Sequence, residues 1–402
     1  MKKILYIVNR IPSRSHTFID REIKSLSGAG YDLKLVSRGS PIEEEVSAKD
    51  IYQYRHTLYL DKACLFLLLW SQFEVIFHSF LAHLNNIRLI IIEKEIKGFR
   101  DRLRLFKHLL EAGYIYSRMR KINISHIHAH FLNAPTSMAL FLSRYLNISY
   151  SFTLHGSNIF LDPLMLGTKL KFSRNAVTVS EYNKKFLLKK YGIYLSKKIH
   201  IIRCGIDTSL FKPTINKKNV CPIVLGVGRL IKLKGFSYLL DACQILKKKG
   251  IVFKCFLIGD GEERSNLIIK SNSLGIDDII TFLGAQPQNR VHTLLMKANI
   301  FVLPCIINDQ GGRDGIPVAI MEAMSMGLPV VSTQIVGIPE LIENGKDGML
   351  VQQKNPPELA SAIESLIRNP NLCYELGKRA RLKIIRKFNI ANTPYYFNKI
   401  FL

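Results

Sequence analysis

Two carboxylates separated by a short helix are the side chains of this sequence best suited to chemistry. Asp314 and Glu322 lie eight residues apart, with a Gly-Ile-Pro turn at 315–317 and a helix-forming run between them; Gly327 then ends the helix. Because eight helical residues make slightly more than two turns, both carboxylates can face one cleft, where the helix start favours an anion. Two carboxylates that can bind hydroxyl groups, placed around a site that favours an anion, suit a nucleotide sugar. Taken alone, the segment also fits a buried helix with Asp314 as its N-cap.

A second candidate is a pair of basic residues near the start of the second half. Arg229 and Lys234 lie five residues apart in a glycine-bounded loop that follows an apolar strand and enters a helix. A guanidinium offers a planar fork of donors and an ammonium a compact charge, so the two can hold one diphosphate from two sides. Lys232, between them, is interpreted as a solvated neighbour.

Histidines form the third candidate group. His155 ends a buried strand and is followed by Gly156, so it can point into a cleft from the acceptor side and hydrogen-bond a transferred sugar. A lone histidine at a strand end is otherwise more often structural. His126, His128 and His130 alternate along an earlier strand and superficially suggest a metal site. Because no further Cys, His or acid pattern supports a metal, we expect none.

Two loops complete the candidate site. Ser15 and Thr17 belong to the loop between the first strand and its helix, and we expect them to cap that helix and to contact donor or acceptor. Gly259 follows a strand within a Gly-Asp-Gly segment, which predicts a close-approach turn near a base or diphosphate.

Two series of alternating strands and helices must position these residues, divided by a polar linker at 212–219 that contains Pro213. Strands are expected at 4–8, 33–37, 126–129, 150–154, 176–179, 199–202, 223–227, 254–258, 279–282, 300–303, 329–332 and 348–351. Helices are expected at 136–146, 181–190, 235–249, 262–274, 288–298, 317–326 and 357–368, with one or two more over 374–402. The alternation predicts two parallel sheets with helices on both faces and a ligand cleft at the carboxyl ends of the strands.

Composition limits the class of protein. A chain of 402 residues with 48% hydrophobic content fits two packed domains and excludes wholesale disorder. Seven scattered cysteines without a C-x-x-C pair favour neither a zinc site nor a disulfide framework, which fits a reduced cytoplasmic compartment. The apolar run at the N-terminus is too short for a signal peptide and is expected to form a buried strand.

The charge points to an anionic partner. There are 57 basic and 31 acidic residues, a net charge of +26, with clusters over 94–121 and 184–203. No nucleic-acid signature accompanies them, so an anionic membrane surface is the favoured partner and a solvated basic face the alternative. Residues 62–92 are strongly apolar, but Glu74, His78 and His83 argue against a spanning helix. Helices lying on a membrane and ordinary core packing both remain open for this stretch.

The motifs together resemble family 4 of the retaining glycosyltransferases. Asp314-x7-Glu322, with its Gly-Leu-Pro-Val-Val exit, resembles that family's Glu-x7-Glu, with Asp in place of the first Glu. Its Asp-Gly-Ile-Pro version is similar to the subgroup that builds bacterial exopolysaccharide, such as the colanic acid glycosyltransferases. Residues 225–236 resemble Gly-Arg-Leu-x-x-x-Lys-Gly, and 151–158 resemble Thr-x-His-Gly-x-Asp, with Asn158 replacing the acid. The first loop resembles Pro-x-x-Ser-Glu-Thr-Phe, with His16 replacing Glu.

The resemblance implies a GT-B fold: an acceptor-side domain over 1–211, a nucleotide-sugar domain over 212–385, and a tail over 386–402 that packs back on the first domain. It implies metal-independent, cofactor-free transfer of a hexose from a nucleotide diphosphate sugar to a glycan or lipid-linked acceptor at the inner face of the plasma membrane, with no nucleic-acid partner. The implied catalytic residues are His155, Asp314, Arg229 and Lys234. The implied donor-binding residues are Arg229, Lys234, Glu322, Gly315, Ile316, Pro317 and Gly259. A nucleotide-sugar epimerase and a non-enzymatic polyanion-binding protein remain the alternatives.

Overall fold

The computed structural model describes residues 2–13, 16–42, 46, 48–161, 163–213 and 221–401. Ser15 and most of the predicted linker, 214–219, lie outside the described residues. The chain forms two compact units. Unit 1 comprises Met1–Val179, Asn183–Arg203 and Thr393–Leu402, and unit 2 comprises Ser180–Tyr182 and Cys204–Asn392. The predicted domain limits, at 211/212 and 385/386, stay predictions.

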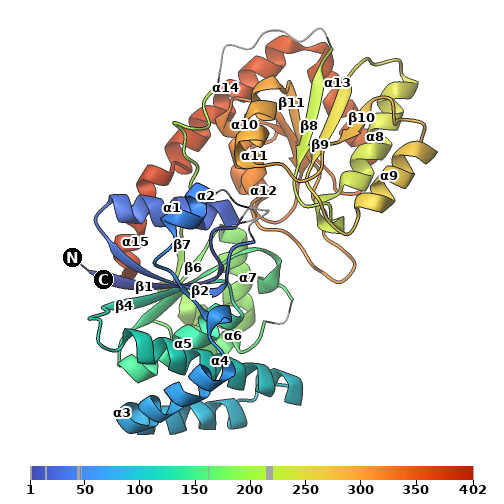
Figure 1. Ribbon diagram of the computed structural model, residues 1–402. Helices are drawn as coiled ribbons and strands as arrows, with labels where there is room; N and C mark the ends of the chain where they lie inside the picture. The colour runs from blue at the N-terminus through green and yellow to red at the C-terminus, as the bar shows by residue number, and fades with distance from the viewer. Residues whose placement is uncertain are drawn as a thin grey trace. The chain divides into compact units, whose positions relative to one another are not determined.

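Unit 1 is built on a seven-stranded parallel sheet in the order β3-β2-β1-β4-β5-β6-β7 (Figure 1). Its strands are β1 (Lys3–Arg10), β2 (Asp32–Gly39), β3 (Leu58–Tyr59), β4 (His126–His130), β5 (Tyr150–Leu154), β6 (Asn175–Thr178) and β7 (Ile199–Ile201). Its helices are α1 (Thr17–Gly28), α2 (Ala48–Gln53), α3 (Leu65–Ile92), α4 (Phe99–Met119), α5 (Ala134–Leu146), α6 (Leu166–Phe172), α7 (Glu181–Tyr191) and α15 (Thr393–Phe401). Helix α7 begins in the short segment assigned to unit 2.

Strand β1 shows how the sheet is covered on both faces. Leu5 and Ile7 belong to a core that includes buried residues of α4, α5 and α6. Their neighbours Ile4 and Tyr6 point to the other face and belong to a second core, with residues of α1 and α15. Because successive strand residues point to opposite faces, an unbroken apolar strand requires such double coverage.

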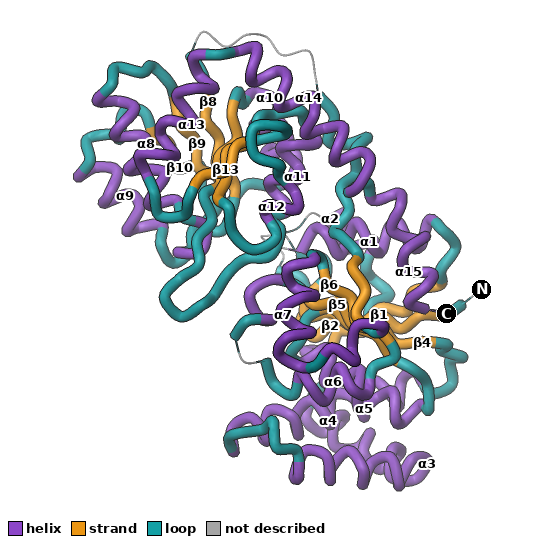
Figure 2. The backbone as a smooth tube through the Cα atoms, turned by 180° about the vertical axis from the view of Figure 1, so that it is seen from behind, coloured by secondary structure: helices purple, strands orange, loops and turns teal. Residues whose placement is uncertain are grey.

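Unit 2 repeats the scheme with a six-stranded parallel sheet in the order β10-β9-β8-β11-β12-β13, seen from behind in Figure 2. Its strands are β8 (Ile223–Val227), β9 (Lys254–Ile258), β10 (Ile280–Phe282), β11 (Ile300–Leu303), β12 (Val330–Thr333) and β13 (Met349–Val351). Its helices are α8 (Phe236–Lys248), α9 (Arg264–Ser273), α10 (Gln288–Lys297), α11 (Val318–Ser325), α12 (Ile338–Leu341), α13 (Pro356–Arg368) and α14 (Pro370–Lys387).

The two sheets confirm the predicted fold class, and the predicted strands match the observed ones closely. The stretch between β3 and β4 was the hardest to predict. It forms the 28-residue helical element α3, which is kinked at Ser79 (φ −145°, ψ 41°) and packs on α4, and α4 packs in turn on α5. Figure 1 shows α3 as an outer layer of unit 1, beyond the helices that cover the sheet. By length and composition α3 could cross a membrane, although the sequence predicts otherwise, and only 17% of its most apolar window is buried.

A buried lysine makes the stability of unit 1 depend on pH. Lys169 in α6 is fully buried, and its ammonium donates to the backbone oxygen of Leu132 at 2.6 Å. Burial lowers the pKa of Lys169 from 10.5 to about 7, partly opposed by Glu95. Between these values the unfolded chain binds more protons than the folded one, so the free energy of unfolding rises with pH there, by at most about 1.4 kcal/mol per pH unit.

We therefore expect Lys169→Met to flatten the rise in stability between pH 7 and 10. The exposed neighbour Lys171 provides the matched control, because Lys171→Met removes an equal charge without removing a buried one. Urea unfolding at pH 7, 8, 9 and 10 gives the slope of the free energy of unfolding against pH for the wild type, Lys169→Met and Lys171→Met. Equal slopes for the wild type and Lys169→Met would show that this ammonium does not titrate within the window.

Candidate functional site

The centre of the candidate site in unit 2 is an ion pair between residues 80 positions apart. The Lys234 ammonium donates to the Asp314 carboxylate. Lys234 follows β8 and Asp314 follows β11, and these two strands are neighbours at which the strand order reverses. The carboxyl ends of strands at such a reversal form the usual ligand crevice of an open parallel sheet.

Gly235 explains how the loop after β8 reaches the loop after β11. It adopts φ +69°, and a Cβ there would lie 1.9 Å from the backbone oxygen of Pro304. The contact is continued by a hydrogen bond from the Ile306 N–H to the Leu233 oxygen at 3.0 Å. A side chain at residue 235 would force the two loops apart, so glycine is required to bring Lys234 to Asp314.

Mutual attraction keeps both members of this pair charged. Burial by itself would raise the pKa of Asp314, but Lys234 and, to a lesser degree, Arg229 lower it below its ordinary value. Burial would likewise lower the pKa of Lys234, and Asp314 raises it instead. Arg229 is exposed and close enough to influence both groups. Two cations and one anion leave a net positive charge, which suits a phosphate group.

The second carboxylate lies where the sequence predicts it. Helix α11 begins at Val318 with Pro317 as its N-cap, and no side chain caps it by a hydrogen bond. Glu322 is buried within this helix, 8% exposed. Ahead of the helix, the Gly315 N–H donates to Asp314 Oδ1 at 3.2 Å, so Asp314 precedes the helix and is not its N-cap. Donor binding by Gly315, Ile316, Pro317 and Glu322 stays a prediction.

Gly259 forms the close-approach turn that the sequence predicts, but against protein backbone. It has φ +141°, and a Cβ would lie 1.9 Å from the backbone oxygen of Gly228. The loops after β8 and β9 therefore touch, joined by a hydrogen bond from the Gly228 N–H to the Ile258 oxygen at 2.9 Å. Packing alone explains this glycine, and its contact with a donor stays a prediction.

In unit 1, His155 directly follows β5 and is 9% exposed. Its Nε2 lies 3.0 Å from Nδ1 of His130, and the two rings stack with an interplanar angle of 11°. Phe18 and Phe131 also contact its ring. Burial holds the pKa of His155 well below its ordinary value, which keeps the imidazole neutral. The side chains of Ser157 and Asn158, next in the motif, lie outside the described part of the chain.

Two of the three histidines of β4 contact nearby hydroxyls, and the third, His130, contacts His155. His126 contacts the hydroxyls of Ser149 and Ser151 at 2.9 and 2.7 Å. His128 contacts Ser151 and Thr153 at 2.8 and 2.9 Å, using both ring nitrogens. All three histidines are almost completely buried. The alternation along β4 therefore has a structural use for His126 and His128, which pair with the hydroxyls of β5.

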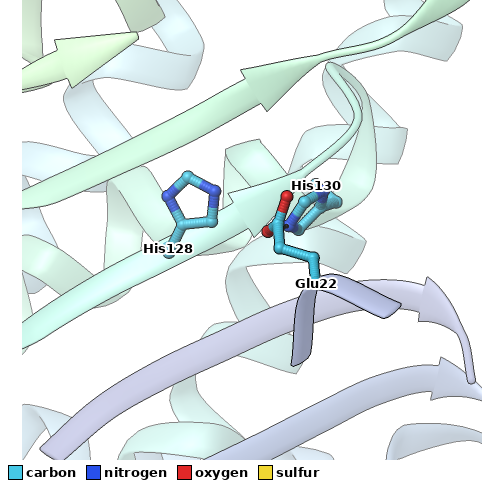
Figure 3. A group of neighbouring side chains, drawn as sticks. All are labelled: Glu22, His128 and His130. Carbon is cyan, nitrogen blue, oxygen red and sulfur yellow. Dashed lines mark ion pairs between the residues drawn. The ribbon is translucent and has the colours of Figure 1, made fainter. Parts of the chain in front are cut away.

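Glu22 of α1 lies beside His130, as Figure 3 shows. Its Oε1 lies 3.0 Å from Nε2 of His130 and also accepts a hydrogen bond from Tyr6. Glu22, His128 and His130 place possible ligand atoms within 4.8 Å of one another, a spacing that a metal could use. Every nitrogen of His128 and His130 nevertheless lies within 3.0 Å of a protein partner. This arrangement fits an internal hydrogen-bond chain, and the expected lack of a metal stays a prediction.

Sequence reasoning missed Glu22 and His130 as neighbours of His155. Glu22 lies between Ile19 and Ile23 on the buried face of α1, and an acid within an apolar helix stripe is the signal that could have identified it. Phe131, which follows His130, has φ +73°, a conformation that costs a bulky residue about 1–2 kcal/mol. Thr17 is the first residue of α1, and its N-cap is His16, so the expectation that Thr17 caps the helix is wrong.

We expect His130 to fix the tautomer of His155. When His130 is neutral and its Nε2–H faces Glu22, its Nδ1 accepts from Nε2–H of His155, which leaves Nδ1 of His155 as an acceptor. His130→Gln should therefore change the nitrogen NMR shifts of His155 and lower turnover by about five- to ten-fold, the value of one hydrogen bond. His126→Gln, at the far end of the same strand, is the control. Unchanged His155 shifts in His130→Gln would contradict this role.

Comparisons with known proteins bear on the family to which the chain belongs. The putative colanic acid biosynthesis glycosyltransferase WcaL of Escherichia coli (strain K12) is 36% identical over 197 residues, 48% of each chain. The amylovoran biosynthesis glycosyltransferase AmsK of Erwinia amylovora is 34% identical over 195 residues, again 48% of each chain. The match thus spans about half the length of these relatives. The structure of HepE from Anabaena in complex with UDP-glucose has a TM-score of 0.74 at 15% identity, over 100% of this chain and 99% of that one.

Two family models match consecutive parts of the chain. The model described as Glycosyltransferase Family 4 matches residues 16–210, and the model described as Glycosyl transferases group 1 matches residues 207–383. Together they account for nearly the whole sequence and confirm the resemblance that its motifs predict. With its two parallel sheets and its likeness to HepE over the full chain, this protein belongs to the group 1 glycosyl transferases, family 4, with the GT-B fold.

Proposed function

We propose that this protein is a retaining glycosyltransferase that moves a hexose from a nucleotide diphosphate sugar to a glycan or lipid-linked acceptor in bacterial exopolysaccharide biosynthesis. The observation that carries the proposal is the Lys234–Asp314 pair, with Arg229 beside it, at the strand-order reversal of unit 2. Family membership and the names of the relatives, which refer to colanic acid and amylovoran, support the same role.

The proposed roles follow from the charges. Arg229 and Lys234 neutralise the diphosphate as it leaves, and Lys234 can do so while held by Asp314 because an ammonium has three donors. Asp314 contacts the transferred sugar and Glu322 holds the ribose hydroxyls. No covalent nucleophile is required when fixed cations stabilise the charge that develops on the leaving group. In unit 1, His155 hydrogen-bonds the sugar.

The partners are part of the proposal. HepE was solved with UDP-glucose, which supports a nucleoside diphosphate hexose as donor. The net charge of +26 supports binding to an anionic membrane surface, which we propose to be the inner face of the plasma membrane. The charge neutralisation described above needs neither metal nor cofactor, and we propose that the enzyme uses none.

A panel of nucleotide sugars tests the proposal. The donor should raise the thermal midpoint of the protein, and the product made from that donor and an acceptor should keep the anomeric configuration of the sugar, as read by proton NMR. Inversion of that configuration would contradict a retaining reaction. Change at another stereocentre without an acceptor would indicate an epimerase. Salt-sensitive binding of RNA or DNA without nucleotide-sugar binding would indicate a polyanion-binding protein.

A further inference from the structure

Helix α3 turns a mixed polar and apolar side toward the protein and most of its large apolar residues outward. Its buried residues are Ser71, Val75, His83, Asn86 and Ile90, three of which are polar. Its exposed large apolar residues are Leu65, Phe66, Leu69, Trp70, Phe73, Ile76, Phe77, Phe80, Leu81, Leu84, Ile91 and Ile92. A surface helix of a soluble protein normally shows the opposite pattern.

Hydrogen bonds to the rest of unit 1 fix this orientation. His83 Nδ1 lies 2.9 Å from the Tyr145 hydroxyl of α5, and the amide of Asn86 donates to the Phe141 oxygen at 3.2 Å. Gln72 donates to the Leu110 oxygen of α4 at 3.2 Å. Rotating α3 to bury its apolar side would break these hydrogen bonds. They therefore hold the apolar side outward.

Few polar residues interrupt the apolar side of α3: among its exposed residues, only His78, Asn85 and Arg88 are polar or charged. Glu74 pairs with Arg120 at the end of α4, at 3.1 Å. His83 is buried, so of Glu74, His78 and His83, which in the sequence argue against a spanning helix, only His78 is exposed. The exposed residues include Phe73 at 68%, Phe77 at 84% and Trp70, the only tryptophan of the chain. Aromatic side chains are typical of the boundary between lipid and water.

Basic groups lie beside the apolar side. A groove of about 540 Å³ at the C-terminal end of α3 is lined by Arg88 and Arg144 together with Asn85 and Asn147. Over residues 62–121 the sequence has eleven basic and five acidic residues. A large apolar face with a cationic groove at its edge matches acyl chains with anionic headgroups.

We propose that α3 lies in the plane of an anionic phospholipid bilayer, with its apolar side among the upper acyl chains and Arg88 and Arg144 at the headgroup phosphates. The assignment of α3 rests on the proposed membrane location of the protein, for which α3 would be the binding segment. A second copy of the chain is disfavoured as occupant, because two molecules of charge +26 repel each other. A spanning position is disfavoured because it would break the hydrogen bonds of α3 to α4 and α5.

The single tryptophan provides a specific measurement on the full chain. Vesicles of phosphatidylglycerol and phosphatidylethanolamine should shift the emission of Trp70 to shorter wavelength, and brominated acyl chains should quench it. Vesicles of phosphatidylcholine alone should bind more weakly, and high salt should weaken only the binding to anionic vesicles. An unshifted emission with anionic vesicles at low salt would overturn the proposal.

Paired variants distinguish binding through α3 from nonspecific adsorption of exposed apolar side chains to vesicles. Phe73→Ser with Phe77→Ser should weaken binding to anionic vesicles about ten-fold or more. Val252→Ser with Ile269→Ser removes two side chains of unit 2 that are 74% and 66% exposed, and should leave binding unchanged. Arg88→Gln should cost about five-fold and reduce the dependence on salt. Equal losses in the two double variants, with circular dichroism showing both folded, would refute the assignment.

Two further readouts test the alternatives to an in-plane helix, and two more separate this proposal from the proposed function. A concentration-dependent dimer that Phe73→Ser with Phe77→Ser abolishes, without vesicle binding by the wild type, would replace the bilayer by a second copy. Resistance of the bound protein to extraction by alkaline carbonate would replace the in-plane position by a spanning one. Donor binding, measured by calorimetry without vesicles, should be the same in wild type and in these variants. Vesicle binding should survive in Lys234→Ala, so either proposal can fail without the other.

Discussion

Lys234→Ala is expected to lower turnover by about 10²- to 10³-fold, the loss typical of removing one preorganised group that stabilises developing charge. The Lys234 ammonium is held in place by Asp314 and by the contact of Gly235 with the loop after β11. A cation fixed in this way needs no reorganisation when the diphosphate departs. Single-turnover kinetics with saturating donor should show the loss in the chemical step.

Two controls separate this role from a structural one. Lys232→Ala removes an exposed lysine two residues away and should leave turnover unchanged. Asp314→Asn removes the partner but keeps the cation. If Lys234 served only to hold Asp314, the two variants would lose the same thermal stability and leave the rate of the chemical step intact. Wild-type single-turnover rates in Lys234→Ala would contradict the proposed role.

Glu322→Gln is expected to weaken donor binding by about 100-fold, because two charge-assisted hydrogen bonds to the ribose hydroxyls would be reduced to ordinary ones. Glu322 is mostly buried in α11. Burying a carboxylate costs solvation free energy, which hydrogen bonds to the ribose hydroxyls would offset in the donor complex. Calorimetric titration with the donor found in the nucleotide-sugar panel measures the change.

A modified donor makes this test specific for the ribose. A donor that lacks the 2′-hydroxyl should bind the wild type more weakly, and Glu322→Gln should then weaken binding of that donor much less than it weakens binding of the full donor. Glu343→Gln, which changes an exposed acid of the same unit, is the control. Equal losses for both donors in Glu322→Gln would move Glu322 from the ribose to another part of the ligand.

The parts of the fold that follow from local pattern were predictable from sequence. Strands β5, β8, β9 and β11 have the predicted bounds, because short apolar runs between turn residues specify buried parallel strands. Helix α11 was also predictable from local signals, since Pro317 is its N-cap and Gly327 follows its end. Motif order also led to Arg229, Lys234, Asp314 and His155, each of which the structure places after the end of a strand.

What could not be predicted depends on contacts between distant segments. Lys234 and Asp314 were predicted as separate members of a site, but their direct pairing depends on two loops that meet only in the folded sheet. Glu22 reaches His130 from a helix more than 100 residues earlier in the chain. The orientation of α3 depends on which of its faces finds hydrogen-bond partners on α4 and α5. No local pattern contains that information.

Helix α15 sets the order in which the protein can be completed during translation. Phe397, Ile400 and Phe401 fill the same core as Ile4 and Tyr6 of the first strand, so this core is complete only after α15 has been synthesised. At about 5–20 residues per second, the ribosome needs roughly 10–40 s to proceed from the end of the first part of unit 1 to its last helix. During that interval the part of the sheet face that α15 covers stays exposed, and such apolar surface favours binding of chaperones.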